Sequence, residues 1–204
     1  ADGEIFNKYF GVTVDGDFDG RSVLNISSDI EDIASRTKMS QQQIINIIER
    51  SRKKLLECRD KRVKPARDEK ILTAWNGLMI GSFAEAGSVL NNYDYIHVAE
   101  KCASFILDKL CPNGRLVRVY KDSHAKLNGY LEDYAFLVEG LLNLHEATLH
   151  PRWLLAAVDL GHSMVELFWD NHSDGFFDTG CDHENLVLRP KNMFDNAIPS
   201  GISM

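Results

Sequence analysis

Residues 68–87 read DEKILTAWNGLMIGSFAEAG, an apolar helical pattern that contains three glycines. A glycine inside a helix costs about 1 kcal/mol relative to alanine, so Gly77, Gly81 and Gly87 need a reason in packing or in function. Gly77 and Gly81 are four residues apart and therefore lie on one face of the helix. The missing side chains allow either a second helix backbone or a ligand to approach closely. Of these two explanations we favour close packing of a second helix.

Apolar residues recur at helical spacing in most of the chain after residue 38. The first of these segments has a capping box, because Gln43 follows Ser40 by three residues. The segment from Asp68 is expected to present one broad apolar face, made of Ile71, Trp75, Leu78, Met79 and Phe83. Six helices are predicted, at about residues 40–55, from 68, 94–110, 130–148, 151–168, and from Ser200.

The connections between these helices alternate between long and short. Residues 58–67, 111–128 and 169–196 form long connections, and the other links need only a few residues. Short links make neighbouring helices antiparallel, so the long connections should emerge on one rim. The N-termini of the second, fourth and sixth helices face the same rim, and their unpaired N–H groups favour anions or carboxylates there. Short strands are predicted at 115–120 and 186–188.

Polar residues gather at this predicted rim, and their gathering is the strongest functional signal that the residues give. They are Arg67, Asp68, Lys70, Tyr130, Glu132, Asp133, Arg189, Lys191, Asp195 and Ser200.

Within this group, GYLEDYAF at residues 129–136 places two carboxylates in the first turn of an otherwise apolar helix. Successive helical residues point about 100° apart, so Glu132 and Asp133 face different directions, and Asp133 is in line with the apolar residues. Asp133 is either a charge that complements the helix dipole or an ionised catalytic base. Asp195 or Glu132 would be its acid partner in a carboxylate pair. For Ser200 we favour a helix cap over a nucleophile.

The composition excludes several function classes. A net charge of −7 argues against nucleic acid as a partner, and no apolar run approaches the roughly 20 residues of a membrane span. Four cysteines without C-x-x-C spacing indicate a reducing, cytoplasmic location. DGDFDG at residues 15–20 resembles half of a calcium loop but has Ile26 where the twelfth-position glutamate is required. His172, Cys181 and His183 are irregularly spaced for zinc, so neither a metal nor another cofactor is expected.

Four segments together resemble one known family. They are FGVTVDGDFDGRSVLNI (10–26), KPARDEKILTAWNGLMI (64–80), GYLEDYAFLVEGLLNLHEA (129–147) and DGFFDT…LVLRPKNMFDNAIPSG (174–201). The family is that of the spermatogenesis-associated, thioredoxin-domain-containing proteins and their bacterial relatives. The resemblance implies a slice of a longer protein that has a thioredoxin-like domain and an (α/α)₆ toroid, similar to N-acylglucosamine 2-epimerases and six-hairpin glycosidases. Residues 1–38 would be an irregular arm, and residues 39–204 part of the toroid.

The resemblance also marks motif positions as candidate site residues. Carried over in this way are Asp68, Lys70, Trp75, Asn76, Glu132, Asp133, Tyr134, Arg189, Lys191, Asp195, Pro199, Ser200 and Gly201. One expectation is an epimerase-like or hydrolase-like domain acting on a sugar, with Trp75 stacking on the ligand and Asp133 as base. Arg189 and Lys191 would orient an anionic or hydroxyl-rich substrate. The other expectation is a non-catalytic toroid that binds a thioredoxin-like domain or a protein partner.

Overall fold

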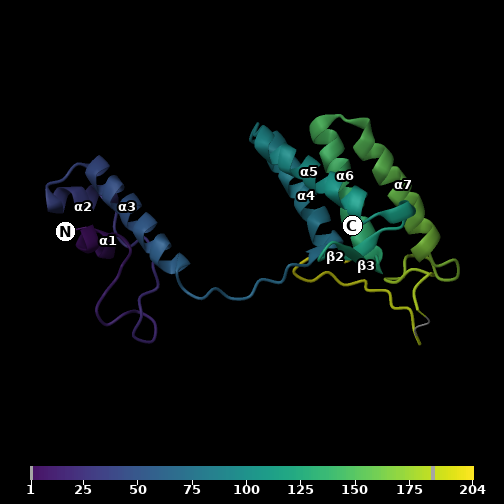
Figure 1. The fold of residues 1–204 in the computed structure, drawn as a ribbon, viewed down its shortest axis with the longest axis horizontal. Helices are drawn as coiled ribbons and strands as arrows, with labels where there is room; N and C mark the ends of the chain where they lie inside the picture. The colour runs from purple at the N-terminus through teal and green to yellow at the C-terminus, as the bar shows by residue number, and fades with distance from the viewer. Residues whose placement is uncertain (1, 185–186) are drawn as a thin grey trace. The chain divides into compact units, whose positions relative to one another are not determined.

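A computed structural model describes residues 2–184 and 187–204 of the chain. It divides into two compact units, one ending at Arg67 and one running from Asp68 to Met204 (Figure 1). Each unit has a hydrophobic core of its own.

The first unit consists of the helices α1 (Asp2–Tyr9), α2 (Ile30–Thr37) and α3 (Gln41–Asp60). Buried isoleucines from all three helices form its core, namely Ile5, Ile33, Ile44, Ile47 and Ile48. The capping box predicted at the start of α3 is confirmed, because Ser40 Oγ accepts from Gln43 N and Gln43 Oε1 accepts from Ser40 N.

Two features of this unit differ from the sequence-based expectation. Residues 1–38 are not irregular throughout, because α1 and α2 are helices whose apolar residues pack against α3. The boundary between the compact units lies between Arg67 and Asp68, whereas the prediction divided the chain at residue 38. Both differences have the same cause, since these two short helices are stabilised by tertiary packing rather than by strong local signals.

The second unit contains two helical hairpins and a small sheet. The helices are α4 (Thr73–Val89), α5 (Tyr93–Lys109), α6 (Leu131–Thr148) and α7 (Pro151–Phe168). The antiparallel sheet has the order β1 (Ile71–Leu72), β2 (Val117–Lys121) and β3 (His124–Asn128). A 3₁₀ turn at Pro112–Gly114 precedes β2. The strand expected at 115–120 is thus present as β2, and the one expected at 186–188 lies partly outside the described residues.

The glycines of α4 allow close contact with α6. A Cβ on Gly77 would lie 2.6 Å from the carbonyl carbon of Phe136, and a Cβ on Gly140 would lie 2.4 Å from the carbonyl oxygen of Gly77. Real Cβ atoms do not approach backbone atoms so closely, so the two helices can touch only at glycine. At Gly87 a Cβ would meet Ile96 of α5 at 2.6 Å. The explanation by helix packing is therefore confirmed.

The start and the buried face of α4 differ from the prediction. The helix begins at Thr73 rather than near Asp68, because Ile71 and Leu72 pair with Tyr120 and Val119 as strand β1. The large apolar residues do not form its buried face, since Trp75 is 60% exposed and Met79 is 50% exposed. The residues of α4 that are buried are mostly small, namely Thr73, Ala74, Gly77, Ile80, Gly81, Ala84 and Gly87.

One end of the four helices carries the hairpin of β2 and β3 together with the segment that follows α7 (Figure 1). The N-termini of α4 and α6 meet at this end, where Ala74 N donates to the carboxylate of Asp133. The shared rim predicted from the alternating link lengths is thus present in the second unit. A sixth helix is not seen in the described residues near Ser200, where a turn from Ser200 to Ser203 occurs instead.

Candidate functional site

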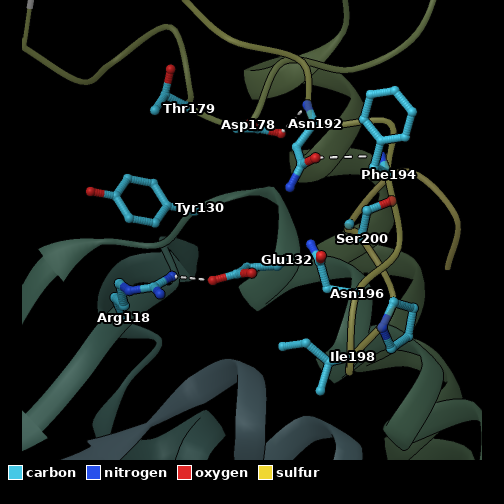
Figure 2. A pocket seen from close by; sticks show the side chains of 12 residues that line it. Arg118, Tyr130, Glu132, Asp178, Thr179, Asn192, Phe194, Asn196, Ile198 and Ser200 are labelled. Carbon is cyan, nitrogen blue, oxygen red and sulfur yellow. Dashed lines mark hydrogen bonds and ion pairs between the residues drawn. The ribbon is translucent and has the colours of Figure 1, made fainter.

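A cleft of 390 Å³ opens at this rim between β2, the N-terminus of α6 and the segment after α7 (Figure 2). Its walls are formed by Arg118, Tyr130, Glu132, Asp178, Thr179, Asn192, Phe194, Asn196, Ile198, Pro199, Ser200 and Gly201.

Arg118 is the cation of the cleft. It projects from β2, and its Nη1 lies 2.8 Å from Glu132 Oε1 and 3.0 Å from Asp133 Oδ2. Its guanidinium also lies over the ring of Tyr130, 4.7 Å from the ring centre. Burial lowers the pKa of Arg118, but Asp133 and Glu132 outweigh burial, so this pKa lies above its ordinary value. One arginine therefore joins β2 to the first turn of α6 and fixes the direction of Glu132.

Asp133 has no exposed surface and does not line the cleft. Its Oδ1 accepts from Ala74 N at 3.0 Å, and its Oδ2 accepts from Tyr130 N at 2.9 Å as well as from Arg118. Burial raises the pKa of the Asp133 carboxyl, while Arg118 and the two backbone N–H groups oppose that shift. The carboxylate thus holds the starts of α4 and α6 together. This arrangement leaves no access for a substrate, so the structure does not support the predicted base role for Asp133.

Glu132 is the neighbour that does reach the cleft. Its side chain is 34% exposed and lines the cavity beside Arg118 (Figure 2). The turn of about 100° between successive helical residues separates the two neighbours. It directs Asp133 into the interface between α4 and α6 and directs Glu132 into the cavity.

Asp178 supplies a second carboxylate to the cleft wall. Its Oδ1 accepts from Asn192 N at 3.1 Å, and its main-chain oxygen accepts from Leu131 N at 3.0 Å. Asn192 in turn accepts from Phe194 N at 3.3 Å. These bonds fasten the segment that contains Asn192 and Phe194 to the N-terminus of α6 and so build the outer wall.

Asp195 orders a turn rather than facing the cleft. Its Oδ1 accepts from Ser200 N at 2.8 Å and from Ser203 Oγ at 2.6 Å. The hydrogen bond from Ser200 N and that from Ser203 lower the pKa of the Asp195 carboxyl. Ser200 is 6% exposed, lines the cleft and accepts from Ser203 N. Ser200 therefore caps a turn rather than the expected helix, and the predicted acid role of Asp195 has no support in this position.

Arg189 and Lys191 are engaged in holding the loop after α7. Arg189 donates to the main-chain oxygens of Thr179 and Leu167. Lys191 Nζ lies 2.8 Å from Asp170 Oδ2 and donates to Ser173 Oγ at 2.8 Å. Neither side chain lines the cleft. Both predicted substrate-orienting cations therefore fix the loop that forms the cleft wall.

The remaining predicted binding residues also lie away from the cavity. Tyr134 is fully buried, and its OH accepts from Arg115 at 2.8 Å and from Leu116 N at 3.0 Å. Asn76 donates to Leu72 O at 2.7 Å and accepts from the thiol of Cys102.

Two further candidates are exposed at the surface. Asp68 forms an ion pair with Lys70 at 3.1 Å, which lowers the pKa of its carboxyl. Trp75 is exposed on α4. Neither residue lines the cleft, so Trp75 is not placed to stack on a ligand that occupies it.

The sequence reasoning missed several cleft residues. Arg118 was absent from the predicted site, although a charged residue between Val117 and Val119 of an alternating strand was a usable signal. Tyr130 was placed at the rim without a role. Asp178, Asn192, Phe194 and Asn196 lie in a long loop whose path no local pattern predicts.

Within residues 2–184 and 187–204, no group of three or more His, Cys, Asp or Glu side chains is placed to hold a metal ion. None of the helices described is both long enough and apolar enough to cross a membrane.

Comparison with known proteins connects this chain to named relatives. No family model matches the chain. Spermatogenesis-associated protein 20 of Homo sapiens is 32% identical over 223 residues, and the protein of the same name from Rattus norvegicus is 33% identical. Each alignment covers 99% of this chain and 28% of the relative. The chain is therefore homologous to these proteins over nearly its whole length, which confirms the resemblance, and it spans 28% of their length.

Solved structures connect the fold to sugar epimerases. Cellobiose 2-epimerase from Spirochaeta thermophila matches with a TM-score of 0.53 at 15% identity, over 64% of this chain and 34% of that one. A sugar epimerase from a ruminal bacterium matches with a TM-score of 0.50 at 14% identity, over 68% and 33%. The predicted fold class, a partial helical toroid of antiparallel hairpins, is thus confirmed. Identities this low establish the fold alone.

Proposed function

We propose that the cleft binds a sugar or sugar derivative and that Glu132 transfers a proton to or from it. The observation that carries this proposal is the position of Glu132. It is the carboxylate of the segment YLEDYAF that opens into a cavity, on a fold shared with sugar epimerases. A proton-transferring group must be within hydrogen-bond reach of its substrate. Glu132 meets that requirement for a ligand in the cleft, and the buried Asp133 does not.

The two carboxylates of the cleft would have different tasks. Arg118 lies 2.8 Å from Glu132 and holds its carboxylate in the cleft, where it would accept a proton from the ligand. Asp178 comes from the loop after α7 and accepts from Asn192 N. It would hydrogen-bond substrate hydroxyls or act as the second carboxylate. Epimerase-like and hydrolase-like chemistry both use such a pair of groups.

Phe194 replaces Trp75 as the expected stacking surface. Its ring is 79% exposed at the edge of the cleft (Figure 2). The ring of Tyr130 is already covered, because His183 stacks on it with the ring centres 5.2 Å apart and Arg118 lies over it at 4.7 Å. An exposed aromatic face suits the apolar face of a sugar ring.

A thermal-shift screen tests the proposal. The wild-type protein is mixed with glucose, mannose, cellobiose, glucosamine and N-acetylglucosamine, and a bound sugar raises the melting temperature by mass action. We expect at least one positive sugar, and we expect Glu132→Gln to abolish its turnover. Glu139→Gln changes the same residue type on an exposed position of α6 and should behave as wild type. Absence of any sugar-induced shift would refute the proposal.

A non-catalytic toroid that binds a thioredoxin-like domain or another protein is the second candidate. It is favoured by one observation, namely that the carboxylates of Asp133 and Asp195 both accept structural hydrogen bonds. Proton NMR in D₂O separates the two candidates. An epimerase exchanges a substrate proton for deuterium and a hydrolase releases a reducing sugar, whereas a binding domain does neither.

We also propose a reducing compartment such as the cytoplasm. The thiol of Cys102 donates to Asn76 Oδ1 at 3.3 Å, and burial raises the pKa of both Cys102 and Cys111, so both are held as thiols. Thiol labelling of protein isolated from its own cells under acidic quench should find all four cysteines reduced. A disulfide in that material would contradict this assignment.

A further inference from the structure

The charged groups around the cleft bear on the class of sugar that it would accept. Its lining contains one cation, Arg118, and two carboxylates, Glu132 and Asp178. The buried carboxylate of Asp133 lies directly behind, 3.0 Å from the same Arg118. Two carboxylates, Glu132 and Asp133, therefore already pair with the one guanidinium, and Asp178 adds a further negative charge to the cleft wall.

Other cations near the rim are occupied elsewhere. Arg115 forms a bidentate pair with Asp182, at 2.7 and 2.9 Å. Lys191 pairs with Asp170. Arg189 directs its guanidinium to main-chain oxygens behind the wall. None of these three side chains lines the cavity.

Three N–H groups at the starts of α4 and α6 are also already bonded. The N–H of Ala74 at the start of α4 and the N–H of Tyr130 at the start of α6 donate to Asp133. The N–H of Leu131 donates to the main-chain oxygen of Asp178. Three N–H groups at the helix starts, where a phosphate would bind, are thus already bonded to acceptors of the protein.

We propose that the cleft selects a sugar without an anionic group, neutral or carrying an amine, and rejects phosphorylated and carboxylated sugars. This inference rests on the proposed function, because it names the substrate class of the same cleft. An anion in the cavity meets the unpaired charge of Asp178 and competes with Glu132 and Asp133 for Arg118. A protonated amine on the sugar would instead be attracted to the carboxylate of Asp178. Of the two occupants expected at the rim, anions or carboxylate side chains, the carboxylate of Asp133 occupies the N–H groups of Ala74 and Tyr130.

Matched sugars that differ only in charge test this selectivity. We compare glucose, glucosamine, glucose 6-phosphate and glucuronate, and the corresponding mannose set, by titration calorimetry with the wild-type protein at low salt. Like charges at short range in a partly buried site predict that the anionic member binds about tenfold or more weakly than the neutral one. High salt should narrow that difference.

Asp178→Asn isolates the charge, because the amide oxygen can still accept from Asn192 N. In this variant the ratio of the dissociation constants for glucose 6-phosphate and glucose should be severalfold smaller than in the wild-type protein. Asp174→Asn makes the same charge change on an exposed residue outside the cleft and should leave the discrimination unchanged.

The outcomes separate the two proposals. Equal or tighter binding of the phosphorylated or carboxylated sugar overturns the selectivity while leaving sugar binding intact. An unchanged discrimination in Asp178→Asn overturns the assignment of the selectivity to this carboxylate. Failure of every sugar to bind overturns the proposed function and this inference together.

Discussion

Replacing Asp133 by alanine should destabilise the second unit strongly, because this carboxylate joins two helix starts. The change leaves the buried N–H of Ala74 and the half-buried N–H of Tyr130 without their acceptor. Each unsatisfied donor costs about 1–3 kcal/mol. Arg118 keeps Glu132 as a partner. Removing the carboxylate also removes the burial cost that raises its pKa, so we expect the lower half of the summed range, a loss of about 3 kcal/mol.

Equilibrium unfolding in urea measures this loss directly. All three tryptophans, Trp75, Trp153 and Trp169, lie in the second unit, so the intrinsic fluorescence reports its unfolding. Asp159→Ala is the matched control, because Asp159 is exposed on α7 and surface substitutions of this kind change stability by less than about 0.5 kcal/mol. If Asp133→Ala shifts the free energy of unfolding no more than Asp159→Ala does, the structural role assigned to Asp133 is wrong.

Three further predictions use other parts of the second unit. Gly77→Ala should lower the free energy of unfolding by about 2 kcal/mol or more, because the added Cβ meets the α6 backbone. Gly161→Ala, with no atom within 4 Å of the added Cβ, should instead raise the free energy of unfolding by about 0.5–1 kcal/mol. Equal effects of the two substitutions in urea unfolding would contradict the close packing. Phe194→Ala should weaken binding of a sugar about tenfold or more without lowering the melting temperature, and undiminished binding in calorimetry would remove Phe194 from the site. The hydrogen bond from Arg115 lowers the pKa of the Asp182 carboxyl, so this pair stabilises the fold above the ordinary carboxyl pKa of about 4, and the stabilisation is lost as the pH falls below that value. In urea unfolding between pH 3 and 7, the free energy of unfolding should therefore fall less steeply toward low pH for Asp182→Asn than for wild type. Parallel curves for the two proteins would refute the assignment.

The helices and their order were predictable from the sequence because local signals and tertiary packing agree there. Pro151 opens α7 at its first position, as expected. The capping box at Ser40 marks the start of α3. The alternation of short and long links was enough to predict that the starts of α4 and α6 lie at one rim.

The buried face of α4 was not predictable from hydrophobicity. Trp75 and Met79 are large and apolar but exposed, whereas the interface with α6 is made by residues small enough for two backbones to touch. The glycines themselves indicated the correct face. In such helices the small residues are the better guide to the contact.

The candidate site was predictable only in part. The rim and the direction of Asp133 toward the interior followed from helix geometry, whereas Glu132 was expected only as a possible acid partner of Asp133. The role of Asp133 was not predictable, because the donors that occupy it, Ala74 N and Arg118, come from segments distant in sequence. The outer wall of the cleft depends on similar long-range bonds, such as that from Asn192 N to Asp178.

The most direct test of the central claim is to locate a bound sugar by methyl NMR. Ile198 lines the cleft and is 41% exposed, whereas Ile80 is 1% exposed in the core between the helices. Titration with the sugar that gives the largest thermal shift should move the methyl signals of Ile198 in a saturable manner and leave those of Ile80 in place. Saturable shifts elsewhere in the protein with an unchanged Ile198 would contradict the assignment of the cleft as the binding site.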